Sequence, residues 1–140
     1  MVTMIKVFSA ELDKLYDMLD FIRMQALDAG FDPCYVNKIE LATEEVLVNI
    51  ISYGYPNGEH GKIEIECSLS DNFDLEIIIK DKGIPYNPLK AQTERDSKAN
   101  LDERSVGGYG IFFILNLMDE VMYKREENSN VLTLKKFHLN

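Results

Sequence analysis

The chain has little of several residue types, and each shortage excludes a class of protein. Its 140 residues include two cysteines, four prolines and no tryptophan. Cys34 and Cys67 are too few and too far apart for a metal-binding knuckle, so we expect a partly exposed thiol at Cys34 and a buried one at Cys67. No apolar run approaches the roughly 18 residues that suggest a membrane span. Residues 1–8 lack the features of a signal peptide, and we expect a cytoplasmic protein without membrane contact.

Basic residues are also scarce. The chain has 15 lysines and arginines against 24 acidic residues, which gives a net charge of −9. This balance argues against non-specific binding of nucleic acid, which needs a basic surface. It still permits a phosphate ligand, because helix N-termini bind anions on acidic proteins, and it suits a basic protein partner. With 46% hydrophobic and 28% charged residues, the composition is that of one soluble globular domain over residues 1–140.

The spacing of the apolar residues predicts an α+β fold. The elements expected in chain order are a strand over 1–8, a helix from Ser9 to Gly30, a helix from Asp32 to Tyr53, strands over 63–69 and 75–79, a helix over 110–119, and a hairpin of strands 121–125 and 131–137. No internal repeat is present. This order predicts a two-layer α/β sandwich in which helices cover one face of a mixed, mostly antiparallel sheet.

Several details of these elements are testable. We expect Ser9 to cap the first helix and Leu12 to belong to its buried face. Asp32 and Pro33 are typical of a helix start, and Tyr53 falls on the buried stripe of that second helix. Glu126 to Asn130 are expected to form the turn of the hairpin. Residues 82–106 form a polar loop too long for a simple connection.

The first candidate site segment is Glu45-x-x-x-Asn49 in the second helix. Residues four apart share a helix face. Mg²⁺ accepts a side-chain oxygen and usually keeps waters and phosphates as its other ligands, so Asn49 can be a magnesium ligand. Glu45 can accept a proton from an attacking hydroxyl or water. Taken alone, a solvated Glu45 and a loop-bridging Asn49 explain the pattern more simply.

The second segment is Asp81-x-Gly83, directly after an apolar strand. A carboxylate there can accept a hydrogen bond from an exocyclic amine such as that of adenine. Gly83 allows a flat base or another backbone to approach closely. The simpler alternative is an ordinary Asp-x-Gly turn, although Pro85 and Pro88 make the segment more distinctive.

The third segment, Gly107-Gly108-x-Gly110, opens an apolar helix. Exposed backbone N–H groups at a helix N-terminus bind phosphates. The segment is neither a Walker loop nor a dinucleotide fingerprint. A flexible linker explains the glycines alone. Arg104 either reaches a phosphate or is a solvated arginine.

Together, in this order, the three segments resemble the N, G1 and G2 boxes of the GHKL (Bergerat-fold, histidine-kinase-like) ATPases. The finer resemblance is to the small bacterial anti-sigma-factor serine/threonine kinases of partner-switching systems. It runs roughly from Phe8 to Phe137 and is carried by residues 40–45 with 49–55, residues 81–88, and residues 107–121 (GGYGIFFILNLMDEV).

The resemblance implies ATP and Mg²⁺ as cofactors. Asn49 would ligate Mg²⁺, Glu45 would be the general base, and Asp81 would hold the adenine amine. The nucleotide would also be bound by Gly83, Arg104, Gly107, Gly108 and Gly110, under a lid of about residues 89–106. It further implies a homodimer that phosphorylates a STAS-type anti-sigma-factor antagonist and sequesters a sigma factor.

Two other functions remain open at this point. One is a nucleotide-binding partner switch with little or no kinase activity and a non-transcriptional output, although retention of Glu45 favours the kinase. The other is a histidine kinase. It is disfavoured because no dimerisation domain with a phospho-accepting histidine fits this length, and His60 and His138 are poorly placed for that role.

Overall fold

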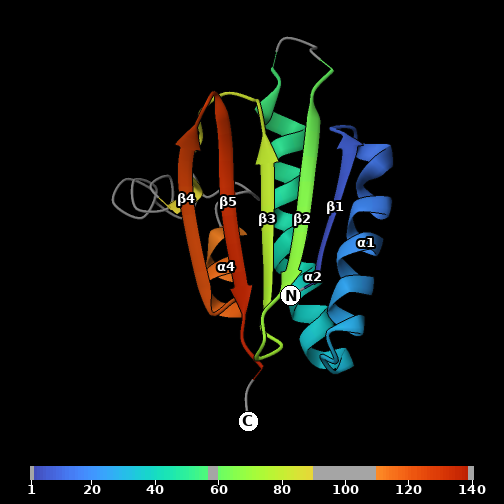
Figure 1. The fold of residues 1–140 in the computed structure, drawn as a ribbon. Helices are drawn as coiled ribbons and strands as arrows, with labels where there is room; N and C mark the ends of the chain where they lie inside the picture. The colour runs from blue at the N-terminus through green and yellow to red at the C-terminus, as the bar shows by residue number, and fades with distance from the viewer. Residues whose placement is uncertain (1, 57–59, 90–109, 139–140) are drawn as a thin grey trace, which may run out of the picture.

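The computed structural model describes residues 2–56, 60–89 and 110–138. Five antiparallel strands form one sheet in the order β1-β2-β3-β5-β4. The helices lie on one face of this sheet, with α1 behind β1, α2 behind the middle strands and α4 behind β5 and β4 (Figure 1). The elements are β1 (Val2–Ser9), η1 (Leu12–Lys14), α1 (Leu15–Asp28), α2 (Pro33–Asn49), η2 (Ile50–Gly54), β2 (Lys62–Leu69), β3 (Leu75–Asp81), α4 (Gly110–Leu117), β4 (Glu120–Glu126) and β5 (Ser129–Lys136).

This architecture confirms the predicted two-layer fold, and the sheet is more regular than expected. Every strand pair is antiparallel rather than mixed. The core lies between the layers and is formed by alternate residues of the strands and one face of each helix. Ile63, Ile65, Ile77, Ile79 and Leu134 are among its fully buried side chains. Complete burial of such a side chain contributes about 1.5–3 kcal/mol.

The helix boundaries follow local signals in most places. The carboxylate of Asp32 accepts a hydrogen bond from the Tyr35 N–H, and Pro33 occupies the first turn, so the predicted start of α2 is confirmed. Gly30 ends the α1 region with a φ of +89°, a value that favours glycine. As predicted, Cys34 is exposed and Cys67 is buried.

Two predictions at the first helix were wrong. Glu11, not Ser9, precedes the helical residues, and no side chain caps them. The first turn is a short 3₁₀ segment that turns Leu12 outward, so this side chain is 67% exposed and Met18 fills the core instead. A 3₁₀ turn has three residues per turn, which shifts the residues before it off the buried stripe of α1.

The second helix also departs from its predicted pattern after Asn49. Residues 50–54 form a π-helical turn, η2. A wider turn rotates later side chains relative to the preceding α-helix, and Tyr53 is 66% exposed rather than buried. The predicted burial of Tyr53 was therefore wrong, and the turn carries Tyr53 toward the upper end of the molecule.

The hairpin is longer and tighter than predicted. Glu126 and Ser129 pair as the last residues of the ladder, and only Glu127 and Asn128 form the turn. Both have positive φ values, 50° and 65°, as in the two-residue hairpin turns that match strand twist. As a result, Asn130 is a paired strand residue opposite Asp81 and not part of the turn.

Candidate functional site

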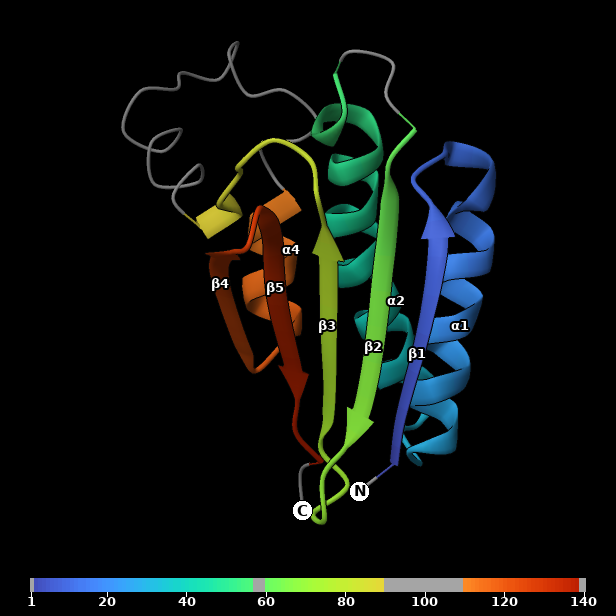
Figure 2. The same ribbon diagram turned by 45° about the horizontal axis from the view of Figure 1, so that its top comes forward.

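Four segments end or begin at the upper end of the sandwich. These are the C-terminal end of α2 with η2, the end of β3, the start of β5 and the first turn of α4 (Figure 2). They enclose a cavity of about 240 Å³. Its lining residues are Val46, Asn49, Ile50, Tyr53, Gly54, Asp81, Ile84, Tyr86, Pro88, Ile114, Tyr123, Asn130 and Leu132. Apolar walls with a few polar groups are typical of ligand pockets.

Asn49 and Glu45 lie one turn apart on α2. Asn49, the last residue of the regular helix, lines the cavity and is half-buried. Within the described residues, its side-chain amide makes no hydrogen bond. A half-buried amide without a protein partner is available for a ligand. Glu45 shares this helix face but is not among the described residues that line the cavity.

Glu45 is electrostatically suited to take up a proton. Its partial burial raises the pKa of the carboxyl, and the neighbouring charge of Glu44 raises it further. Within the described residues it has no cationic partner that would hold its pKa low. A general base works best when its pKa approaches the working pH, so both effects favour that role.

Asp81 is the last residue of β3 and is 5% exposed. Its Oδ1 accepts two hydrogen bonds, from the Gly83 N–H at 2.9 Å and from Asn130 Nδ2 at 3.0 Å. Within the described part of the chain, Oδ2 accepts none. One carboxylate oxygen is therefore committed to the protein, and the other is free to accept a hydrogen bond from a ligand in the cavity.

The electrostatics of Asp81 combine opposing effects. Burial raises the pKa of this carboxyl above its ordinary value, and this effect is the largest. The hydrogen bonds from Asn130 and Gly83 and the charge of Arg125 act in the opposite direction. A buried carboxylate with unused hydrogen-bonding capacity is costly, which is consistent with a site retained for a ligand.

Gly83 is required by close packing. A Cβ atom at this position would lie 2.4 Å from the Gly54 carbonyl oxygen and 2.9 Å from Asp81 Oδ1. Directly after it, the Ile84 N–H donates to the same Gly54 oxygen at 2.9 Å. The glycine thus allows the segment after β3 to pack against the end of η2, and these two segments form adjoining walls of the cavity.

Tyr55 braces the same junction from the other side. Its hydroxyl donates to the Lys62 carbonyl and accepts from the Lys82 N–H, both at 2.9 Å. Its ring lies where a side chain on Gly61 would be, since a Cβ there would approach ring atoms to 2.1 Å. One tyrosine therefore connects η2 to the start of β2 and to the residue after β3.

Sequence reasoning missed the residues of β4 and β5 that complete this site. Asn130 contacts Asp81, and Tyr123 donates to Asn130 Oδ1 at 2.5 Å. Arg125 donates to the Gly83 carbonyl at 3.0 Å. The three are brought to Asp81 by strand register alone, so no short motif marks them. A correct hairpin register would have placed Asn130 opposite Asp81.

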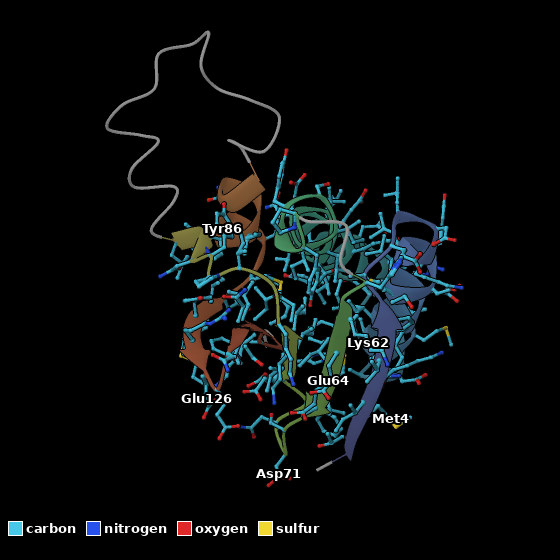
Figure 3. The ribbon with its side chains drawn as sticks, turned by 90° about the horizontal axis from the view of Figure 1, so that it is seen from above. Met4, Lys62, Glu64, Asp71, Tyr86 and Glu126 are labelled. Carbon is cyan, nitrogen blue, oxygen red and sulfur yellow. The ribbon has the colours of Figure 1, made fainter. Side chains whose placement is uncertain are left out.

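Of the remaining predicted site residues, the structure describes only Gly110. Gly110 is the first residue of α4, whose N-terminal end lies at the upper end of the sandwich beside η2 and β3 (Figure 2). Arg104, Gly107 and Gly108 lie outside the described residues, as does the predicted lid except for Leu89. Tyr86, before that segment, lies on the helix side of the sheet, near α4 (Figure 3).

The donor set fits one type of metal better than others. Among the described residues, no group of three or more His, Cys, Asp or Glu side chains could hold a metal ion. This does not suit zinc, which takes mostly His and Cys ligands. It fits Mg²⁺, which is held by one or two protein oxygens together with substrate phosphates. The half-buried Asn49 amide provides such an oxygen at the cavity wall.

Comparisons with known proteins agree with this reading of the fold. The family model described as "Histidine kinase-like ATPase domain" matches residues 8–136. The anti-sigma F factor of Oceanobacillus iheyensis is 36% identical over 104 residues, which cover 71% of this chain and 68% of that protein. The anti-sigma F factor of Clostridium beijerinckii is 30% identical, covering 84% of each. The serine-protein kinase RsbW of Listeria monocytogenes is 26% identical, covering 76% of this chain and 69% of that protein.

A solved structure shares the fold. The histidine kinase domain of the Erythrobacter litoralis EL346 blue-light activated histidine kinase matches with a TM-score of 0.54 at 16% identity. The match covers 87% of this chain but only 60% of that one. This chain belongs to the histidine kinase-like ATPase family, and within it to the group of anti-sigma-factor kinases. Within the described ranges, no helix is both long and apolar enough to cross a membrane.

Proposed function

We propose that this chain is an anti-sigma regulatory factor with ATP-dependent serine/threonine protein kinase activity. It phosphorylates a STAS-type anti-sigma-factor antagonist and sequesters a sigma factor, as a cytoplasmic homodimer. The observation that carries the nucleotide part is that Asn49 and Asp81, from different elements, line one cavity. The names of the relatives, anti-sigma F factor and serine-protein kinase RsbW, support the regulatory part.

Different residues at the cavity bind different parts of the nucleotide. Asp81 Oδ2 accepts a hydrogen bond from the adenine amine, while Gly83 lets the segment after β3 pack against η2 and donates its N–H to Asp81 Oδ1. Asn49 holds Mg²⁺, which when bound neutralises charge on the phosphates. The N-terminal end of α4, with Gly107, Gly108, Gly110 and Arg104, binds the phosphates.

Glu45 supports the transfer step. Phosphoryl transfer needs mainly positioning and charge stabilisation, so a small domain suffices. As the serine or threonine oxygen of the antagonist bonds to the γ-phosphorus, Glu45 accepts the hydroxyl proton and ADP departs with the former bridging oxygen. The raised pKa of Glu45 suits this role.

The test is transfer of labelled phosphate from ATP to STAS-type antagonists by the wild type and by Glu45→Gln. We expect the variant to lose about 10²–10⁴-fold in rate, the usual contribution of a general base, while binding ATP like the wild type. Glu44→Gln, one position away, is the matched control and should retain transfer.

One observation favours a second function. Glu45 lies outside the lining of the cavity in the described residues. The alternative is therefore a nucleotide-binding partner switch with little or no kinase activity and a non-transcriptional output. ATP binding without transfer to any antagonist, in the wild type and Glu45→Gln alike, would replace the kinase with this switch.

A further inference from the structure

Asn130 uses every hydrogen-bonding position of its side chain. Its Nδ2 donates to Asp81 Oδ1 at 3.0 Å and to the Ile84 carbonyl at 2.8 Å. Its Oδ1 accepts from the Tyr86 N–H at 3.2 Å and from the Tyr123 hydroxyl at 2.5 Å. An amide offers two donors and two acceptor lone pairs, so this 7% exposed side chain has no capacity left for a ligand.

These partners also fix which way the amide points. The Tyr86 N–H can only donate and the Ile84 carbonyl can only accept. A flipped amide would face each of them with the wrong atom, so the Nδ2 group must lie beside Asp81. Asn130 therefore holds Oδ1 of Asp81 and, through the same amide, the backbone of residues 84 and 86.

This arrangement determines which oxygen of Asp81 a ligand meets. Oδ1 is occupied by Asn130 and Gly83, and rotation of the carboxylate would break both hydrogen bonds. Oδ2 remains for the cavity, which Asp81, Ile84 and Tyr86 all line. The residue that sets this geometry lies on β5, 49 positions after Asp81 in the sequence.

We propose that Asn130 is a positioning residue that sets the purine specificity of the cavity by orienting Asp81, without touching the base itself. This rests on the proposed nucleotide function. Asn130 raises the affinity for a nucleotide whose base has an exocyclic amine at the position that Asp81 faces, as in adenine. Asn130 leaves the affinity unchanged for a nucleotide whose base has a keto oxygen there, as in hypoxanthine, because a carboxylate oxygen cannot donate a hydrogen bond to that oxygen.

Asn130→Asp separates this role from simple support of the fold. The substitution is nearly isosteric and keeps the acceptor for Tyr123 and Tyr86. It replaces the donor with a carboxylate about 3.0 Å from Asp81 Oδ1, the distance now spanned by Nδ2. Two carboxylates this close share one proton at low pH and repel each other when both ionise.

The groups facing this pair are few. In the described ranges they include Tyr123 and Arg125 from β4, of which Arg125 donates to the Gly83 carbonyl, and Tyr53 and Tyr86, which line the same cavity. At low pH the shared proton restores a hydrogen bond between the two positions. As pH rises the proton is lost, the carboxylates separate, and Asp81 turns away from its binding orientation. Affinity for ATP should therefore fall with rising pH in Asn130→Asp only.

The experiment is calorimetric titration of the full chain with Mg-ATP and Mg-ITP between pH 5.5 and 8.5. The variants are Asn130→Ala, Asn130→Asp and, as a matched control on the opposite face of β5, Thr133→Ala. Each affinity is divided by that of the wild type at the same pH, so that protonation of the nucleotide cancels.

We expect Asn130→Ala to weaken ATP binding by about tenfold or more, equivalent to about 1.4 kcal/mol, and ITP binding by less than about twofold. Asn130→Asp should bind ATP within a fewfold of the wild type at pH 5.5 and at least about tenfold more weakly at pH 8.5. Thr133→Ala should match the wild type throughout.

Several results would overturn the inference. If Asn130→Ala lost equal affinity for ATP and ITP, Asn130 would be a general support of the fold. If the ATP affinity of Asn130→Asp did not change with pH, Asn130 would not act through Asp81. Wild-type affinity in both variants would overturn this inference while leaving the proposed function in place. A wild type that binds no nucleotide would overturn both.

Hydrogen exchange in the free protein gives a readout without nucleotide. The Gly83 amide donates to Asp81 Oδ1, which Asn130 holds, so it should exchange faster than in the wild type in Asn130→Ala and, at high pH, in Asn130→Asp. The Tyr86 amide donates to Asn130 Oδ1, so it should exchange faster in Asn130→Ala, which lacks this acceptor. Unchanged exchange at both amides would contradict the positioning role. If Asn130→Ala does not fold, Tyr123→Phe, which removes one hydroxyl from the network, takes its place and should weaken ATP binding more than ITP binding.

Discussion

Gly83→Ala is the substitution whose cost follows most directly from the geometry. The new Cβ would lie 2.4 Å from the Gly54 oxygen and 2.8 Å from the Gly54 carbonyl carbon. Side-chain Cβ atoms essentially never approach closer than 3.0 Å, so the two segments must separate by about 0.6 Å. Both atoms belong to the backbone, and no flexible side chain can move aside instead.

The separation has two energetic consequences. The hydrogen bond from Ile84 N–H to the Gly54 oxygen, now 2.9 Å long, would stretch beyond good geometry at a cost of about 0.5–1.5 kcal/mol. Overpacking of a tight contact costs about 1–3 kcal/mol. We therefore expect Gly83→Ala to lower the free energy of unfolding by about 2–4 kcal/mol.

Urea unfolding followed by circular dichroism measures this loss. Gly54→Ala is the matched control, because its Cβ would meet only Ile50 Cγ2 at 3.4 Å and Asp81 Oδ1 at 3.9 Å, which are ordinary contacts. The control should change stability by less than about 1 kcal/mol. A change of similar size in both variants, or none in Gly83→Ala, would refute the close approach of these two segments.

Two further predictions concern buried ionisable groups. The folded state raises the pKa of Asp81 above its ordinary 3.8, so the native protein holds this proton more tightly than the unfolded chain. Its contribution to the free energy of unfolding falls as pH rises through the window above 3.8. Asp81→Asn keeps Oδ1 as an acceptor but does not titrate, so its free energy of unfolding should lack this fall with pH and should be at least that of the wild type at pH 7. The variant should also bind ADP more weakly than the wild type. An unchanged pH dependence of the free energy of unfolding, measured by urea titration, would refute this. Burial also raises the pKa of Cys67 to about 12, so this thiol stays protonated and unreactive at pH 8. A thiol reagent should therefore label only the exposed Cys34 in the folded protein and both cysteines in urea. Rapid labelling of both cysteines in the folded protein would contradict this prediction.

Much of the fold was predictable because it depends on short-range patterns. Alternation over 63–69, the Asp32-Pro33 helix start and the breaker at Gly30 are all encoded within a few neighbouring residues, and the structure confirms them. The errors at Leu12 and Tyr53 share one cause. Both lie in non-α turns, the 3₁₀ segment η1 and the π-helical segment η2, where extrapolating a 3.6-residue period misplaces a side chain.

The site was predictable only where its residues lie in local motifs. Asn49 and Asp81 belong to such motifs, and the structure brings them to one cavity. Asn130, Tyr123 and Arg125 reach Asp81 through the pairing of three strands. That pairing depends on where the hairpin turn falls, and a turn placed over 126–130 removes Asn130 from the ladder. Positioning residues of this kind become visible only once the register is known.

The central claim is that the cavity between α2, β3 and β5 binds a magnesium nucleotide. Its most direct test is calorimetric titration of the full chain with ATP and ADP, with and without Mg²⁺, beside Asn49→Ala. We predict binding by the wild type that Mg²⁺ strengthens, and loss of that Mg²⁺ dependence in Asn49→Ala, because the Asn49 side chain makes no hydrogen bond within the described residues. Absence of binding by the wild type, or equal Mg²⁺ dependence in both proteins, would contradict it.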